Sequence, residues 1–259
     1  MIFLKLIAIS IRSQLAYPGS FIMMTLSHFL GTFIDILGMW VLFDRFKMVQ
    51  GWTLYEVGLI YGIVHMGFAV ADTFARGFDR FYLLVKRGDF DRVLLRPVSP
   101  LFQVAASDVQ LLRLGRFLQG FILLVWSASH FSFSLLSYHS AVILLAIIGT
   151  ASLFYGLMII QATFAFWTTE TLELMNITTF GGVQTAQYPI SIYKKPIRLV
   201  FTFIIPLACV AYYPIATLLH HTSIPFFLGI LAPVIGICFL FIASRFWRLG
   251  ICRYQSTGS

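Results

Sequence analysis

Residues 141–167 read AVILLAIIGTASLFYGLMIIQATFAFW, without one charged side chain. A helix that crosses a hydrocarbon core about 30 Å thick needs about 20 predominantly apolar residues. Hydrocarbon offers the backbone no hydrogen-bond partner, so only helices and closed barrels span a membrane. The run lacks the alternating pattern of a barrel strand. It therefore predicts a transmembrane helix.

The rest of the chain has the composition of a membrane protein. Of its 259 residues, 59% are hydrophobic and 11% are charged, whereas a soluble domain carries about 25% charged residues. The net charge of +8 does not indicate nucleic-acid binding, because the basic residues flank apolar runs, where they set membrane topology. The three cysteines, Cys209, Cys238 and Cys252, are dispersed and show neither a disulfide framework nor paired metal ligands.

Similar apolar windows extend the prediction to an all-α, polytopic membrane fold with about six transmembrane helices in a single domain over 1–259. The spans are expected near 20–43, 55–75, 105–129, 141–167, 198–218 and 225–245. Residues 1–17 carry apolar residues at helical spacing and predict an N-terminal interfacial helix. A cleaved signal is disfavoured, because Arg12 interrupts the apolar run and no small-residue cleavage site follows.

Lys and Arg residues outside the spans predict the orientation, since cytoplasmic flanks keep positive charge during insertion. One side collects 16 of the 18: Lys5, Arg12, Arg76, Arg80, Lys86, Arg87, Arg92, Arg96, Arg113, Arg116, Lys194, Lys195, Arg198, Arg245, Arg248 and Arg253. Arg45 and Lys47 lie on the other. Both termini are therefore predicted to be cytoplasmic. The outer connections are short, and the inner ones, 76–104 and 168–197, are long.

The connection 76–104 concentrates acidic, basic and aromatic residues. Gly88 is expected to end a first short helix and Asp89 to cap a second one through Leu95, which prolines then end. Two interpretations stand at this point. The segment is either an amphipathic loop on anionic lipid or an element that couples the spans to a cytoplasmic partner.

Part of this connection carries a family signature. Residues 86–100, KRGDFDRVLLRPVSP, resemble the Gly-acid-x-Asp-x-x-Leu-Leu-Arg-Pro pattern of bacterial type-2 ABC exporter permeases. Weaker likenesses at Gly51-Trp-Thr, Tyr188-Pro-Ile and Tyr213-Pro214 extend the resemblance over most of the chain. It implies a six-span permease in the bacterial inner membrane. One departure is expected: many such exporters carry small helices in the last external loop, whereas 220–224 reads as a tight turn.

The resemblance also implies that the loop 76–104 is a cytoplasmic coupling loop, which docks in a groove of a separate ABC ATP-binding subunit. We expect Phe90 and Leu94 as apolar anchors, and opposite charges that fix the register. The expected docking residues are Arg87, Asp89, Phe90, Asp91, Arg92, Leu94 and Arg96.

The chain lacks a Gly-x-x-x-x-Gly-Lys-Ser/Thr phosphate loop, so it is not expected to be an enzyme or to hold a cofactor itself. ATP and Mg are expected on two copies of the partner ATPase. A second permease subunit, identical or homologous, is expected to complete the pathway, with membrane lipid around it and no nucleic acid.

Asp35 is an acidic residue within the first predicted span. A charge at mid-bilayer costs about 2.5–3.5 kcal/mol on insertion scales, so Asp35 should face protein or water. It is either a cavity residue that contacts cargo or a proton, or a hydrogen-bonded residue between packed helices. Asp72 and Asp108 are expected near the inner ends of the second and third spans, close to Arg76, Arg113 and Arg116, and predict local ion pairs there.

The expected function is ATP-driven export of a hydrophobic or amphipathic compound, such as a drug, a lipid-like molecule or a peptide, because the spans carry few charges. An ion channel or ion exporter would need polar residues along one pore-lining face. An intramembrane enzyme would need convergent catalytic residues, for which no motif is present. A non-transporting membrane scaffold is the remaining alternative.

Overall fold

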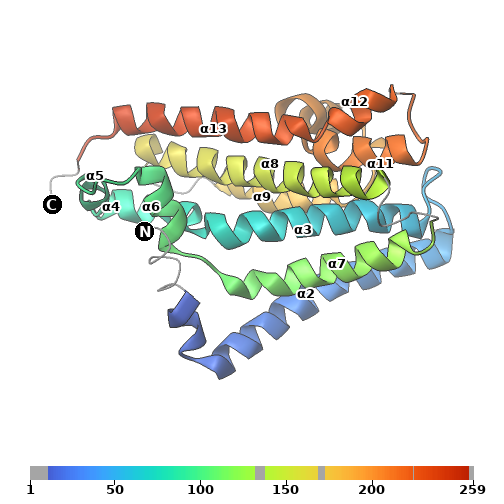
Figure 1. The fold of residues 1–259 in the computed structure, drawn as a ribbon, viewed down its shortest axis with the longest axis horizontal. Helices are drawn as coiled ribbons and strands as arrows, with labels where there is room; N and C mark the ends of the chain where they lie inside the picture. The colour runs from blue at the N-terminus through green and yellow to red at the C-terminus, as the bar shows by residue number, and fades with distance from the viewer. Residues whose placement is uncertain (1–10, 132–137, 169–172, 224, 257–259) are drawn as a thin grey trace.

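The computed structural model describes residues 11–131, 138–168, 173–223 and 225–256. Figure 1 shows an all-α bundle whose long helices run along one axis. Five described helices are long and apolar enough to cross a membrane, or six if one bent pair counts as a span. The predicted all-α polytopic fold is confirmed. Of the predicted interfacial helix, residues 11–15 are helical, and residues 1–10 lie outside the described residues.

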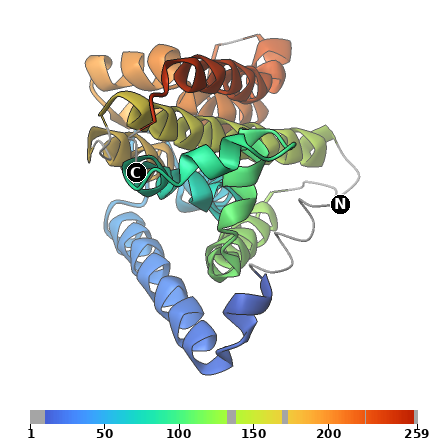
Figure 2. The ribbon, with the colours of Figure 1, turned by 90° about the vertical axis from the view of Figure 1, so that its left-hand side faces the viewer.

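The first two spans differ in how deeply they are buried. Helix α2 (Pro18–Phe46) packs on the bundle near its C-terminal end and diverges from it toward its start (Figures 1 and 2). Helix α3 (Leu54–Asp79) is buried over most of its length and lies at the centre of the fold. A capping box begins it, with Glu56 Oε2 accepting a hydrogen bond from the Thr53 backbone N–H at 2.7 Å.

The connection after α3 folds into three short helices: α4 (Phe81–Lys86), α5 (Phe90–Leu94) and α6 (Pro100–Ser107). They form one end of the bundle, here called the loop end (Figure 1). Gly88 makes the turn between α4 and α5 with a φ of 72°, which glycine adopts without strain. The predicted cap is wrong in detail, because the side chain of Asp89 makes no capping hydrogen bond. Pro100 begins a helix rather than ending one.

The third and fourth spans follow. A 3-10 turn, η1 (Leu111–Arg113), leads into α7 (Leu114–Ala128), so this span begins later than the predicted 105. Helix α8 (Tyr138–Thr168) matches the apolar run 141–167. The final span consists of α12 (Phe226–Leu231) and α13 (Val234–Arg253), and α13 packs along α8.

The long loop predicted at 168–197 is wrong. It contains helix α9 (Glu173–Ala186), which packs against α3 and α8 inside the bundle. Gln187, just after α9, lies 3.0 Å from the Nε2 atom of His65 in the middle of α3. The chain therefore runs back from the loop end into the bundle along α9.

The segment 198–218, predicted as that span, is broken. It comprises α10 (Lys195–Leu199), the π-helical turns η3 (Val200–Ile204) and η4 (Ala208–Tyr212), and α11 (Tyr213–Leu218). The two halves meet at an 83° bend around Pro206, whose missing N–H cannot continue a helix. Small helices therefore precede the last span, contrary to the expected departure from the family pattern.

These small helices lie toward the opposite end of the bundle, here called the turn end. The rings of Tyr212 and Trp52 are 5.5 Å apart, and His221 Nε2 lies 2.8 Å from Glu56 Oε1. The first contact joins the segment after the bend to Trp52, just before α3, and the second joins it to Glu56 in the first turn of α3.

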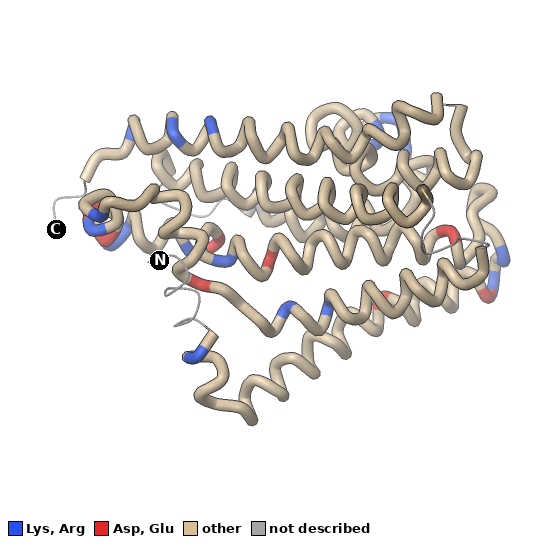
Figure 3. The backbone as a smooth tube through the Cα atoms, in the orientation of Figure 1, with Lys and Arg blue, Asp and Glu red and all other residues tan. Residues whose placement is uncertain are grey.

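The position of α9 also changes the side on which some of the basic residues lie. Arg198 interacts electrostatically with Tyr212, so it lies toward the turn end, and Figure 3 shows basic residues in this part of the molecule. Lys194, Lys195 and Arg198 are therefore not on the side to which we assigned them. Figure 3 still shows basic residues gathered at the loop end, on the short helices there and on the last turns of α13. The described residues begin and end toward the loop end (Figure 1).

The crossing of α8 and α13 generates a stability prediction. A Cβ atom on Gly236 would lie 2.1 Å from the carbonyl oxygen of Gly149, so Gly236→Ala forces the two helices apart. We expect a loss of about 1–3 kcal/mol, typical of overpacking. Thermal unfolding in detergent should show a lower midpoint. Gly19→Ala, where an added Cβ meets nothing within 4 Å, is the control; equal midpoints for both variants would contradict this packing.

Candidate functional site

An aromatic cluster holds the short helices of the loop end against the spans. Phe90 of α5 is 0% exposed. Its ring centroid lies 5.1 Å from Phe81, 5.4 Å from Phe166 of α8 and 5.0 Å from Tyr254, beyond α13. Trp247 of α13 packs on Phe81 at 4.8 Å. Phe90, expected as an apolar anchor for the ATP-binding subunit, is instead buried in this cluster.

The opposite face of α5 and the residues after it are exposed. Leu95 is 85% exposed and Leu94 40%. Three basic side chains, Arg87, Arg92 and Arg96, are exposed beside them. We call these five residues the docking surface. Leu95 was not among the expected docking residues, since the Leu-Leu pair in the sequence does not show which leucine points outward.

The two acids of α5 and its flank have partners within the chain. Asp89 Oδ1 lies 3.7 Å from Arg92 Nη1, and Asp91 Oδ2 accepts a hydrogen bond from Ser256 Oγ at 2.6 Å. Burial and the neighbouring Asp91 carboxylate raise the pKa of Tyr254 to about 12, so its hydroxyl is protonated at neutral pH. The C-terminal segment is thus fastened to α5 by packing and by polar contacts.

Ion pairs connect the same region to the spans. Arg76 Nη1 lies 2.8 Å from Asp79 Oδ2, and Arg80 Nη1 lies 3.0 Å from Asp108 Oδ2. Deeper in the bundle, Asp72 of α3 pairs with Arg113 of η1 at 2.9 Å, with side-chain exposures of 1% and 11%. The prediction that Asp72 and Asp108 each form an ion pair with a nearby arginine is confirmed. Arg76 and Asp79 both belong to α3, whereas the other two pairs join the end of α3 to the end of the connection and α3 to the start of the third span.

A second group of polar side chains connects α2, α3 and α9, and extends from the buried His65 to the exposed Gln184. Asp35 Oδ2 of α2 lies 3.5 Å from Gln184 Nε2 of α9. Gln187 Nε2 donates to Gln184 Oε1 at 2.7 Å, and Gln187 Oε1 lies 3.0 Å from His65 Nε2. The ring of His65 stacks on Tyr61 at 3.8 Å. Asp35 therefore has a hydrogen-bonded neighbour from a distant helix, and its role in a cavity stays a prediction.

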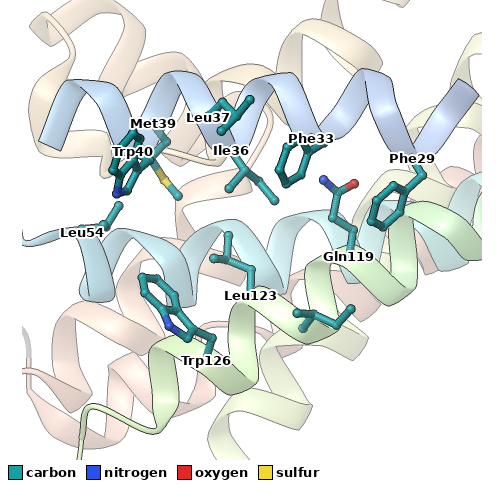
Figure 4. A pocket seen from close by; sticks show the side chains of 11 residues that line it. Phe29, Phe33, Ile36, Leu37, Met39, Trp40, Leu54, Gln119, Leu123 and Trp126 are labelled. Carbon is teal, nitrogen blue, oxygen red and sulfur yellow. The ribbon is translucent and has the colours of Figure 1, made fainter. Parts of the chain in front are cut away.

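An apolar cavity lies between α2 and α7 (Figure 4). Its volume is about 300 Å³, and its lining includes Phe29, Phe33, Trp40, Leu123 and Trp126. Gln119 contributes a polar group at its wall, and its Oε1 accepts a hydrogen bond from the Thr32 hydroxyl. The cavity is wide enough for part of a small apolar molecule. The described residues contain no group of three or more His, Cys, Asp or Glu side chains placed to hold a metal ion.

Comparison with known families decides what kind of membrane protein has this arrangement. The profile of the ABC-2 family transporter proteins matches residues 29–258. The chain belongs to the ABC-2 transporter family. No curated protein and no solved structure matches it. As an ABC-2 permease, it is a multi-pass membrane subunit of an ABC transporter. Permeases of this family work with an ABC ATP-binding subunit and are normally not catalytic themselves.

The buried pair of Asp72 and Arg113 generates a prediction for the permease. Asp72→Asn leaves the Arg113 guanidinium buried without its counter-charge, and breaking such a pair costs about 3–5 kcal/mol. The thermal midpoint in detergent should fall markedly. Replacing both residues, as Asp72→Leu with Arg113→Met, should restore much of the loss. As a control, Asp44→Asn breaks an exposed pair with Lys47 and should change little; a similar small effect of Asp72→Asn would refute the structural role.

Proposed function

We propose that this permease forms one half of the membrane part of an ATP-driven exporter in a bacterial inner membrane, with both termini in the cytoplasm. It moves a hydrophobic or amphipathic compound out of the cytoplasm or the inner leaflet. The observation that carries the proposal is the docking surface: an exposed, basic and apolar face on a short helix whose other face is buried among the spans.

The docking surface supports a specific kind of contact with the ATP-binding subunit. Its exposed Leu95 suits an apolar floor in the partner's groove, and its arginines suit an acidic rim. Asp91 holds the C-terminal segment through Ser256, whereas the exposed 3.7 Å pair of Asp89 and Arg92 contributes little to stability. Both acids contribute to the register of docking. ATP and Mg are held by the partner, two copies of which serve one transporter.

Packing supports the transmission of movement from the docked loop to the spans. A Cβ atom on Gly77 of α3 would lie 1.8 Å from the carbonyl oxygen of Val104 in α6, so these two backbones are in direct contact. The Phe90 cluster adds α8 and α13 to the same unit. A displacement of α5 is therefore passed on as a rigid-body movement of several spans, because packed elements do not deform continuously.

The exposed length of α2 supports the pairing of two permease subunits. Many of its large apolar side chains are exposed, including Met23, Ile34 and Val41, in a segment that crosses the membrane. A second permease, identical or homologous, encloses the pathway together with this one. The apolar cavity beside α2 supports a hydrophobic or amphipathic cargo.

The docking proposal is tested by charge reversal. The tagged permease is purified from its native membrane, and co-purified ATP-binding subunit and ATP hydrolysis are measured. Arg92→Glu places a negative charge where the proposed groove is acidic, and like charges across an interface are unfavourable. We expect loss of the co-purified subunit and of its ATP hydrolysis, with the thermal midpoint of the permease unchanged.

The matched control is Lys47→Glu, a charge reversal at the turn end, where the Lys47 side chain is 79% exposed. It should leave association intact. Leu95→Asp should act like Arg92→Glu, because it removes the apolar contact. Association that survives both Arg92→Glu and Leu95→Asp would contradict the docking surface.

A further inference from the structure

The face of α2 that carries Asp35 has unfilled space beside its backbone. Gly31, Asp35 and Gly38 are spaced by four and three residues, so they share one face of the helix. A Cβ atom added to Gly31 or Gly38 would meet nothing within 4 Å. Across this space stands α9, from which Gln184 reaches Asp35 at 3.5 Å. We call the space between these residues the Asp35 notch.

The notch lies deep in the membrane-spanning part of the fold. Asp35 is eleven residues before the end of α2 at Phe46, which places it about 16 Å from that end at a rise of about 1.5 Å per residue. Since α2 has 29 residues, the carboxyl group is far from both ends. The glycines on either side leave room for a molecule to approach it.

Asp35 differs from the other described acids in its partners. Six of the eight Asp and Glu residues whose side chains are described pair with a Lys, Arg or His side chain within 4 Å, and Asp91 is bound by the C-terminal segment. Among the described residues, no basic side chain lies within ion-pair distance of Asp35. Arg116 acts on it only from farther away, since its guanidinium lies over the Phe68 ring.

Besides Gln184 and the more distant Arg116, two aromatic side chains interact with Asp35. Tyr61 and Tyr188 both interact with its charge, and Tyr188 is partly exposed. An acid beside aromatic rings in an apolar setting is suited to an organic cation, because the carboxylate attracts the charge and the rings accept its alkyl or aryl groups. A bare metal ion fits less well, since Gln184 Oε1 is already bonded to Gln187 and metals such as Ca²⁺ need six or more oxygens.

We propose that the Asp35 notch binds the cationic group of an amphipathic cargo, such as an amine, a quaternary ammonium or a phosphonium with apolar substituents. This rests on the proposed exporter function and narrows the class of cargo. The carboxylate of Asp35 holds the charge, and Tyr188 together with the glycine face of α2 contacts the apolar groups.

Two probe ions of matched shape test the charge preference. Tetraphenylphosphonium and tetraphenylborate have nearly the same size and opposite charge. Their binding to the full-length permease in lipid nanodiscs, with any co-purified subunits retained, is measured by equilibrium dialysis and corrected with empty nanodiscs. We expect the phosphonium to bind, and Asp35→Asn to weaken its binding about tenfold, the size of a change of about 1.4 kcal/mol. Binding of the borate should not fall in this variant.

Asp44→Asn on the same helix is the matched control and should bind as the unaltered chain does. Gly31→Leu fills the notch while keeping the carboxylate, and it should also weaken binding of the phosphonium; this keeps the proposal testable if Asp35→Asn fails to fold. Equal phosphonium binding by the unaltered chain, Asp35→Asn and Gly31→Leu would overturn the proposal. The proposal is also overturned if Gly31→Leu changes only the association of two permeases. In that case the glycine face of α2 is a contact between helices of the two subunits rather than a binding site.

This test is independent of the docking test. Binding is measured without ATP, so a permease whose Arg92→Glu variant keeps its ATP-binding subunit contradicts the docking proposal and leaves phosphonium binding unaffected. Conversely, loss of the docking partner in Arg92→Glu together with unchanged phosphonium binding in Asp35→Asn supports the exporter and overturns the cation site.

Discussion

The burial of Phe90 among aromatic side chains from three other parts of the chain is the contact on which this architecture depends. Phe81, Phe166 and Tyr254 surround it, so α5 is fixed at once to the connection, to α8 and to the end of α13. Because one face of this short helix is held in the core, its other face is left exposed. The same packing makes the helix a rigid extension of the spans, as a coupling element requires.

The fold class was predictable because hydrocarbon imposes a simple rule on sequence. A run such as 141–167 has no soluble alternative, and α8 follows it closely. The rule failed at α9 and at 195–218. Helix α9 contains Asn176, Gln184 and several threonines, so its average hydropathy is low, yet it packs between other helices. The segment 195–218 is more apolar but bends by 83°, and a hydropathy window does not detect a bend.

The sequence indicated which segments hold the candidate residues, but not which of their side chains are buried and which are exposed. The signature at 86–100 drew attention to the connection that carries α5, yet sequence alone does not show that Phe90 is buried and Leu95 exposed. That depends on the positions of Phe166 and Tyr254, which are distant in the sequence. Asp35 was found because charges are rare in spans. Its neighbour Gln184 was missed, since the contact spans 149 positions and the segment around Gln184 was assigned to a loop.

The central claim is that Leu95 meets an ATP-binding subunit on the cytoplasmic side. Labelling of Leu95→Cys with a membrane-impermeant maleimide tests it most directly, in a chain whose exposed Cys238 and Cys252 are replaced by serine. We predict labelling in inside-out vesicles stripped of the ATP-binding subunit, protection when that subunit is present, and no labelling in right-side-out vesicles. Equal labelling with and without the subunit, or labelling from the outside, would contradict the account.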